Sequence, residues 1–261
     1  MKSHLALASL LLWTPFLTGF VLLGKETAKL PASPESPSIN FFWSTDGNAP
    51  QLSDKDKYKD GSYANYPDAE LTPILIQEAI DQWNAVRGSY LRFALQTTTG
   101  ELPLSRTDKT NNIVVKKSNS ASTAAYAAPE VASGSSEITD CDIAINDIKT
   151  SVLSFMETVT HEFGHCVGLG HPHTHYGAIM SYSRGGKSYR LSADDKAGAI
   201  YLYPDPNYVT GEPNEMISCG TIRGEHRAKS SGPWLYWALS MPLIASLFMR
   251  RKAVAVVKRS K

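Results

Sequence analysis

Residues 161–171 read HEFGHCVGLGH, and this stretch decides what is expected of the rest of the chain. Residues four positions apart on an α-helix project from the same face, so His161 and His165 can present imidazole nitrogens to one ion. Gly168 tolerates the positive φ with which a chain leaves a helix abruptly, and the following turn can bring His171 round as a third ligand. The stretch therefore predicts a three-histidine metal site at the end of a helix.

The chemistry of such a site is indicated by the residue beside the first ligand. Three neutral imidazoles leave a fourth position on zinc for water, which is the open geometry of a catalytic site. Glu162 can accept a proton as that water attacks a peptide carbonyl, and can return it to the leaving amine. Each histidine alone is more often a surface or core residue, but the whole pattern would arise by chance in roughly one chain in ten thousand or fewer.

Two further stretches carry a resemblance to a known family. Met180 lies nine residues beyond His171 in GAIMSYS (residues 177–183), and together with the extended histidine motif it resembles the Met-turn of metzincin zinc metalloproteases. Residues 191–203, LSADDKAGAIYLY, resemble the last helix of matrixin catalytic domains. The resemblance covers about Asn40 to Pro204. It implies a zinc-dependent endopeptidase in which Met180 forms the floor beneath the metal.

The Met-turn itself is more similar to the serralysin branch of the metzincins. Its sequence Met180-Ser181-Tyr182 places a tyrosine two residues beyond the methionine, after His171-Pro172. In that branch the tyrosine can reach the zinc or the developing oxyanion, so the resemblance implies that Tyr182 stabilises the transition state. The calcium-binding repeats of serralysins are absent from this sequence.

The number of metal ions is also constrained by the sequence. No histidine occurs between His4 and His161, so a second zinc site based on histidine is not expected and a single catalytic zinc is predicted. Asp54, Asp56 and Asp60 faintly resemble a calcium loop, but the downstream carboxylate is missing, which favours a solvated loop. Calcium is therefore possible but unsupported. His173 and His175 are expected in a loop near the cleft and not as ligands.

Periodicity gives the outline of the fold. An amphipathic helix is expected after the Thr72–Pro73 start and before Gly88, an active-site helix from the Ser154/Glu157 capping box to Gly168, and a last helix over 193–203 capped by Ser192 with Asp195. Strands are expected at 40–44, 90–96, 112–116 and 142–146, with Thr123–Ala128 as the edge strand along which a substrate would extend. The fold class is α/β (α+β) and metzincin-like: a twisted, mainly parallel β-sheet with an active-site helix, a backing helix and a short C-terminal helix.

Both ends of the chain carry apolar segments. Residues 1–24 place Lys2 ahead of a Leu-rich uncharged run, which predicts a signal peptide; an uncleaved membrane anchor is the alternative. Residues 233–249 are uncharged and are followed at once by basic residues, which predicts a transmembrane segment with a basic cytoplasmic tail at 250–261. A buried helix or a sorting signal removed after export are the alternatives. An exported protein, held at the outer face of the membrane or released after processing, is therefore expected.

The rest of the domain plan follows from composition. Residues 25–38 are rich in Pro and Ser and 206–232 read as a linker, which leaves 39–205 for the catalytic domain. In an exported chain Cys141 and Cys166 are expected to pair, with Cys219 left over. The formal charge of +1 gives no strong positive potential that would attract nucleic acid. The expected partners are a peptide or protein substrate and the membrane, and the chain is expected to be monomeric.

These observations favour hydrolysis of internal peptide bonds in extracytoplasmic proteins. Two other functions stay open from the sequence. One is a membrane-tethered zinc-binding or adhesion module that has lost turnover, against which the intact Glu162 argues. The other is a metal-dependent hydrolase that acts on a bond other than a peptide bond.

Overall fold

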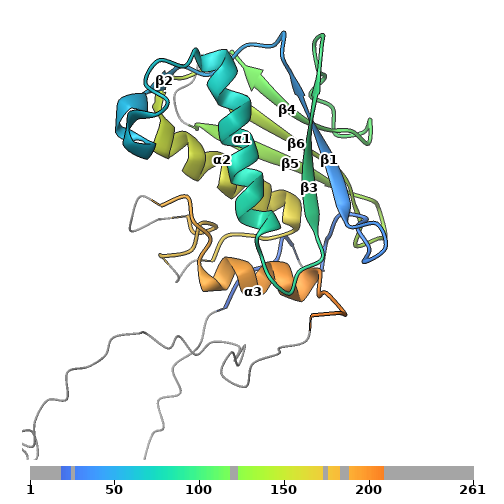
Figure 1. Cartoon of the computed structure of the whole chain (residues 1–261). Coiled ribbons are helices and arrows are strands. Elements are labelled where there is room, and N and C mark those ends of the chain that lie inside the picture. The colour runs from blue at the N-terminus through green and yellow to red at the C-terminus, as the bar shows by residue number, and fades with distance from the viewer. Residues whose placement is uncertain (1–18, 25–26, 118–122, 173–175, 183–187, 209–261) are drawn as a thin grey trace, which may run out of the picture. The chain divides into compact units, whose positions relative to one another are not determined.

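The computed structural model describes residues 19–24, 27–117, 123–172, 176–182 and 188–208 (Figure 1). All of these residues belong to one compact unit, within residues 1–220. The predicted membrane segment at 233–249, the basic tail, Cys219, His173 and His175 lie outside the described residues. No helix in the described part of the chain has the length and apolar character needed to cross a membrane.

A five-stranded sheet forms one layer of the domain, in the order β3-β1-β4-β6-β5 (Figure 1). Its strands are β1 (Ser38–Ser44), β3 (Arg92–Thr98), β4 (Asn111–Lys116), β5 (Ala125–Val131) and β6 (Ile138–Asn146). The pairs β1–β3, β1–β4 and β4–β6 are parallel, and β5 pairs antiparallel with β6 at the edge. The mainly parallel sheet expected from the sequence is therefore present, with one antiparallel edge strand.

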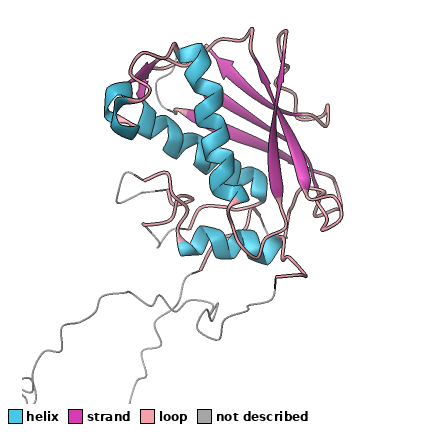
Figure 2. Ribbon diagram, viewed as in Figure 1, coloured by secondary structure: helices cyan, strands magenta, loops and turns pink. Residues whose placement is uncertain are grey.

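Two long helices, α1 (Asp68–Asn84) and α2 (Val152–Val167), cover the same face of this sheet, and α3 (Ala193–Leu202) packs against α2 (Figures 1 and 2). Three aromatic rings fill the layer between sheet and helices: Phe41 of β1, Phe93 of β3 and Phe163 of α2 lie 5.0 to 5.4 Å apart by ring centroids. Such contacts bury large apolar area in defined geometry. They fix α2, which carries the histidine motif, against the sheet.

The start of α1 differs from the sequence prediction. The helix begins at Asp68, so Thr72 and Pro73 lie inside it and do not form its first turn. Thr72 Oγ1 donates to Asp68 O at 2.6 Å, as hydroxyls inside helices do. The first turn carries Asp68 and Glu70, whose negative charges are favourable near a helix N-terminus. Because these residues are polar, the apolar periodicity that marks the rest of the helix does not extend to its start.

The start of α2 also differs from the prediction, while that of α3 agrees. The side chain of Ser151 caps α2 by accepting from Ser154 N at 3.2 Å, so Ser154 is not the cap and Glu157 is not its capping-box partner. At α3, Ser192 and Asp195 form the predicted capping box. The apolar pattern located both helices, but in α2 two serines compete for the cap and only backbone geometry decides between them.

The region expected as a solvated loop contains β2 (Leu52–Ser53) and two short 3₁₀ helices, η1 (Lys55–Lys57) and η2 (Lys59–Gly61). β2 pairs in parallel with β7 (Thr150–Ser151), which directly precedes α2. Part of this loop is anchored, because Tyr58 and Tyr63 donate to Glu78 of α1 at 2.9 and 2.8 Å. Asp54 pairs with Lys57 at 2.8 Å. This arrangement adds no support for a calcium loop.

The N-terminal stretch that the sequence predicts to be a connector is packed where it is described. Ala28, Leu30 and Ala32 are buried. Leu30 N donates to the Tyr203 hydroxyl at 2.8 Å, and Ile138 N donates to Lys29 O at 2.8 Å. The apolar side chains among the prolines and serines of this stretch therefore belong to the core of the domain.

Two carboxylic acids are buried side by side on β6. Asp142 accepts from Ser105 N and Asn112 N, and Asp140 accepts from Lys109 N. Burial, and for Asp140 also the neighbouring charge of Asp142, raises the pKa of each to about 6. These side chains hold the loop before β4 in place through its backbone amides.

Candidate metal centre

The turn at residues 168–170, called the ligand turn below, follows α2 with the geometry that the sequence predicts. Gly168 follows the helix with φ of 106°, a left-handed conformation that favours glycine. Gly168 N donates to His165 O and Leu169 N donates to Gly164 O, at 3.0 and 2.9 Å, which closes the helix end. A Cβ at Gly168 would also lie 2.1 Å from Ala28 O. Glycine is thus required there both by the turn and by the packed N-terminal stretch.

The three histidines meet as predicted. One nitrogen from each of His161, His165 and His171 lies within 4.8 Å of the others, and in the part of the chain that the structure describes no other group of three or more His, Cys, Asp or Glu side chains is placed to hold a metal ion. The Nε2 atoms of His161 and His171 are 3.0 Å apart. The imidazoles therefore surround one point instead of facing solvent separately.

Hydrogen bonds to the backbone orient two of the rings. His161 Nδ1 lies 2.7 Å from Ile179 O and His165 Nδ1 lies 2.8 Å from Leu169 O. A carbonyl oxygen only accepts, so both Nδ1 atoms donate and both Nε2 atoms turn their lone pairs toward the common point. Burial lowers the pKa of His165, which favours the neutral, ligating form of the ring. This donor set fits a zinc ion.

Glu162 lies between the active-site helix and the edge of the sheet. The residue is 6% exposed, and its Oε2 accepts a hydrogen bond from Ala127 N of β5 at 2.7 Å. Glu162 follows His161 directly on α2, and this hydrogen bond holds its carboxylate against the backbone of the edge strand β5. The sequence predicted the role of Glu162 but gave no sign of its contact with Ala127.

Met180 lies against α2 within the histidine motif and is 2% exposed. A Cβ at Gly164 of α2 would lie 2.1 Å from Met180 Sδ, so the glycine in the middle of the motif allows the methionine to reach the helix. Asp195 of α3 accepts from Ile179 N and Met180 N, at 2.9 and 3.2 Å. Since Ile179 O orients His161, Asp195 supports the first ligand through this turn. Sequence reasoning identified Asp195 only as part of a helix cap.

Tyr182 lies beside the third ligand. Its ring centroid is 3.8 Å from that of His171, and the residue is 69% exposed. A tyrosine this exposed contributes little to the core. The side chain therefore borders the candidate metal site from the solvent side.

A disulfide joins the sheet to the active-site helix. Cys141 of β6 and Cys166 of α2 are bonded, as the sequence predicts, and both are fully buried. Cys166 follows His165 directly. The bond therefore ties the backbone at His165 to β6, the strand beside the edge strand β5.

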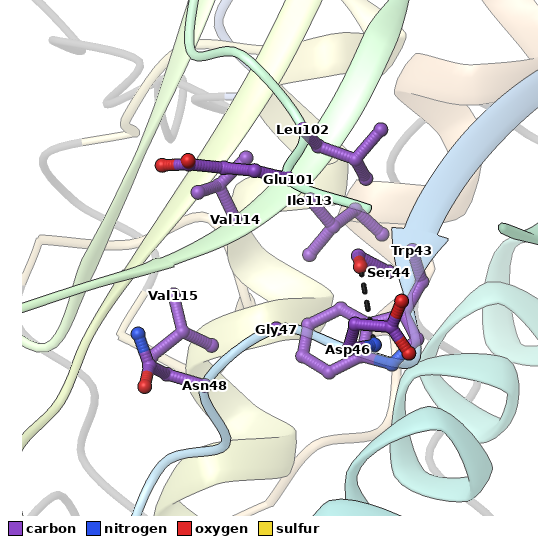
Figure 3. A pocket seen from close by; sticks show the side chains of 10 residues that line it. All are labelled: Trp43, Ser44, Asp46, Gly47, Asn48, Glu101, Leu102, Ile113, Val114 and Val115. Atoms are coloured by element: carbon purple, nitrogen blue, oxygen red, sulfur yellow. Dashed lines mark hydrogen bonds between the residues drawn. The ribbon is translucent and has the colours of Figure 1, made fainter. Parts of the chain in front are cut away.

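A hollow of about 320 Å³ lies elsewhere in the domain, between the end of β1 with the loop that follows it, the loop before β4, and residues 113–115 of β4 (Figure 3). Its lining includes Trp43, Asp46, Asn48, Glu101, Ile113 and Val115, and none of the histidines. Asp46 is engaged in holding the loop, because its carboxylate accepts from Gly100 N at 2.9 Å. This hollow is separate from the candidate metal centre.

The fold and the three converging imidazoles define the class, a domain with a mainly parallel sheet and a candidate metal centre at the end of α2. The Matrixin family model (Peptidase_M10) matches residues 54–204, more than half of the chain, so the chain belongs to the matrixin family of zinc metalloproteases. The matched region includes all three histidines, Met180 and α3.

Other comparisons add little to this assignment. No curated protein matches the chain. Among 128 matching chains of solved structures is one from "GM1 bound form of the ECX AB5 holotoxin", 12% identical, covering 72% of this chain and 89% of its own length with a TM-score of 0.43. A TM-score of this size indicates neither a shared fold nor a shared activity.

Proposed function

We propose that this matrixin is a metalloendopeptidase that uses one zinc ion, held by His161, His165 and His171, and Glu162 as general base. The observation that carries the proposal is the convergence of three imidazoles, two of them oriented by backbone hydrogen bonds, at the end of the helix whose buried Glu162 contacts the edge strand β5. A zinc ion bound there would polarise the substrate carbonyl and lower the pKa of a water molecule.

Glu162 performs the proton transfers in this proposal. As water attacks the carbonyl carbon of the peptide bond, the Glu162 carboxylate takes its proton; the C–N bond then breaks, and Glu162 returns the proton to the leaving amine. The hydrogen bond from Ala127 N fixes the position of the carboxylate. No covalent intermediate with the protein is required.

The outer edge of β5 supplies a surface for an extended substrate. Asn146 N donates to Ala124 O at 2.9 Å, and residues of an antiparallel strand alternate between those that bond to the partner strand and those that do not. The odd-numbered residues of β5 therefore direct their backbone groups away from β6, as the bond from Ala127 N to Glu162 illustrates. We infer that a peptide adds to this edge as a further strand, next to the general base.

Tyr182 is proposed to stabilise the oxyanion, as in the serralysin-like Met-turn that its position resembles. Its contact with His171 places the ring beside the site, and its exposure leaves room for the side chain to move toward a bound substrate. A phenol hydroxyl aimed at the developing negative charge would donate a hydrogen bond that strengthens in the transition state.

The proposed place of action is outside the cytoplasm. The disulfide between Cys141 and Cys166 supports export, because disulfides persist mainly in oxidising compartments. The apolar runs at 1–24 and 233–249 support delivery by a signal and attachment by the C-terminal segment. Extracytoplasmic proteins are accordingly the proposed substrates.

The test combines metal analysis with peptide cleavage on the full chain. We expect one zinc per chain and cleavage of casein or a quenched internal peptide, with activity lost in Glu162→Ala and retained in Glu137→Gln, which changes an exposed carboxylate away from the histidines. Zinc bound without any cleavage in the wild type would favour a binding module. Turnover that survives in Glu162→Ala would contradict the proposed mechanism.

A further inference from the structure

Residues 19–24, with the sequence GFVLLG, run alongside the turn that connects the second and third histidines; they are called the N-terminal strap below. Leu22 forms an antiparallel bridge with Leu169. Leu23 N donates to Gly168 O, and Gly170 N donates to Val21 O, both at 2.8 Å. The strap is therefore paired through its backbone with the ligand turn.

Two glycines provide the space in which the strap lies. A Cβ at Gly170 would be 2.7 Å from Leu22 O, and a Cβ at Gly198 of α3 would be 3.1 Å from Phe20 Cγ. The Phe20 ring also packs on Tyr201 of α3, with 5.4 Å between centroids. The strap thus touches both the ligand turn and α3, and its backbone approaches the turn too closely for a side chain to fit between them.

The paired turn orients two of the proposed ligands. Leu169 O accepts from His165 Nδ1 at 2.8 Å, and Gly170 directly precedes His171. The other backbone hydrogen bonds that this turn makes to described residues run to the end of α2, through Gly168 N and Leu169 N. Displacing the strap would remove the hydrogen bonds that it makes with Gly168 O and Gly170 N. The orientation of the His165 and His171 rings depends on this turn.

We propose that the strap is a positioning element of the zinc site, which holds the 168–170 turn so that His165 and His171 meet His161. The proposal rests on the proposed function, because it takes the three histidines as zinc ligands. It has a consequence for processing: cleavage after Gly24 would remove the strap, so the working enzyme begins at or before Gly19. The predicted signal at 1–24 would then end at least six residues earlier, at residue 18 or before.

The test compares two proline substitutions in the full chain. Leu23→Pro removes the amide that donates to Gly168 O. Val21→Pro is the control: Val21 is exposed, its carbonyl still accepts from Gly170 N in the variant, and the amide that the proline removes does not pair with the turn. Zinc affinity is measured by competition with a chromophoric chelator. Loss of groups that orient metal ligands typically lowers affinity about 10- to 100-fold, so we expect at least about tenfold weaker binding in Leu23→Pro and a change within about twofold in Val21→Pro.

A second measurement separates positioning from a general loss of stability. Gly170→Ala should weaken zinc binding in the wild-type background, because the new Cβ meets Leu22 O, but should add little once Leu23→Pro has released the strap. The visible spectrum of bound Co²⁺, which reports ligand geometry, should change in Leu23→Pro and stay unchanged in Val21→Pro.

The outcomes distinguish the two proposals. Wild-type chain that binds no zinc would overturn the proposed function. Wild-type chain that binds zinc, with equal affinity and equal Co²⁺ spectra in the two proline variants, would overturn the role of the strap while leaving the proposed function intact.

Discussion

Removal of the disulfide between Cys141 and Cys166 should lower the free energy of unfolding by an amount that the structure allows one to estimate. The bond closes a loop with a sequence separation of 25 residues. Chain-entropy arguments for a loop of that length give about 3.5 kcal/mol at 25 °C, from a loss of roughly 12 cal/mol/K in the unfolded state. Both cysteines are fully buried, so the double variant Cys141→Ala/Cys166→Ala also leaves a small cavity.

The measurement is urea unfolding of the wild type and the double variant, followed by tryptophan fluorescence. Trp83 is a suitable probe because it is buried and its indole donates to Thr160 O of α2 at 3.0 Å. Cys219→Ala serves as the control for loss of a thiol and should leave the midpoint unchanged. A fall of less than about 1 kcal/mol in the double variant would show that the unfolded chain is not restrained by this bond, and the reasoning from loop length would be wrong.

Three further predictions concern the site and its surroundings. Gly164→Ala places a Cβ 2.1 Å from Met180 Sδ, and such overpacking should cost about 1–3 kcal/mol of stability in thermal or urea unfolding; an unchanged midpoint would show that the Met-turn yields freely. Tyr182→Phe should lower kcat on the order of 100-fold with zinc content unchanged, and steady-state kinetics showing equal kcat would exclude an oxyanion role. Burial raises the pKa of Asp140 to about 6, above the ordinary value near 4. Ionisation of this carboxyl therefore lowers the free energy of unfolding as the pH rises from about 4 through 6, and protonation restores it as the pH falls. Asp140→Asn should therefore gain stability over the wild type at pH 7.5 and little at pH 4.5, and urea titrations showing the reverse order would contradict the assignment.

Much of the site could be predicted because the spacing of a few nearby residues determines which side chains can meet. The positions of His161 and His165 follow from one helical turn, and Gly168 marks the helix end by its conformational freedom. The same logic correctly located α3 through Ser192 and Asp195. It failed at the start of α1, where polar first-turn residues gave no periodic signal, and at α2, where two serines could serve as the cap.

The contacts that support the ligands could not be predicted, because they join residues far apart in the chain. Ala127 N reaches Glu162 across 35 positions, and Asp195 holds the Met-turn 15 and 16 positions away. Neither pairing leaves a periodic trace in the sequence.

By itself, then, the sequence determined the kind of chemistry, since ligand identity and helical spacing are local properties of a few residues. Only the tertiary structure decided what holds those residues in place: the edge strand at Glu162, α3 beneath the Met-turn, and the strap along the ligand turn. The physical reason is that backbone amides and carbonyls form these contacts. Every residue but proline carries both groups, so only folding selects which of them meet.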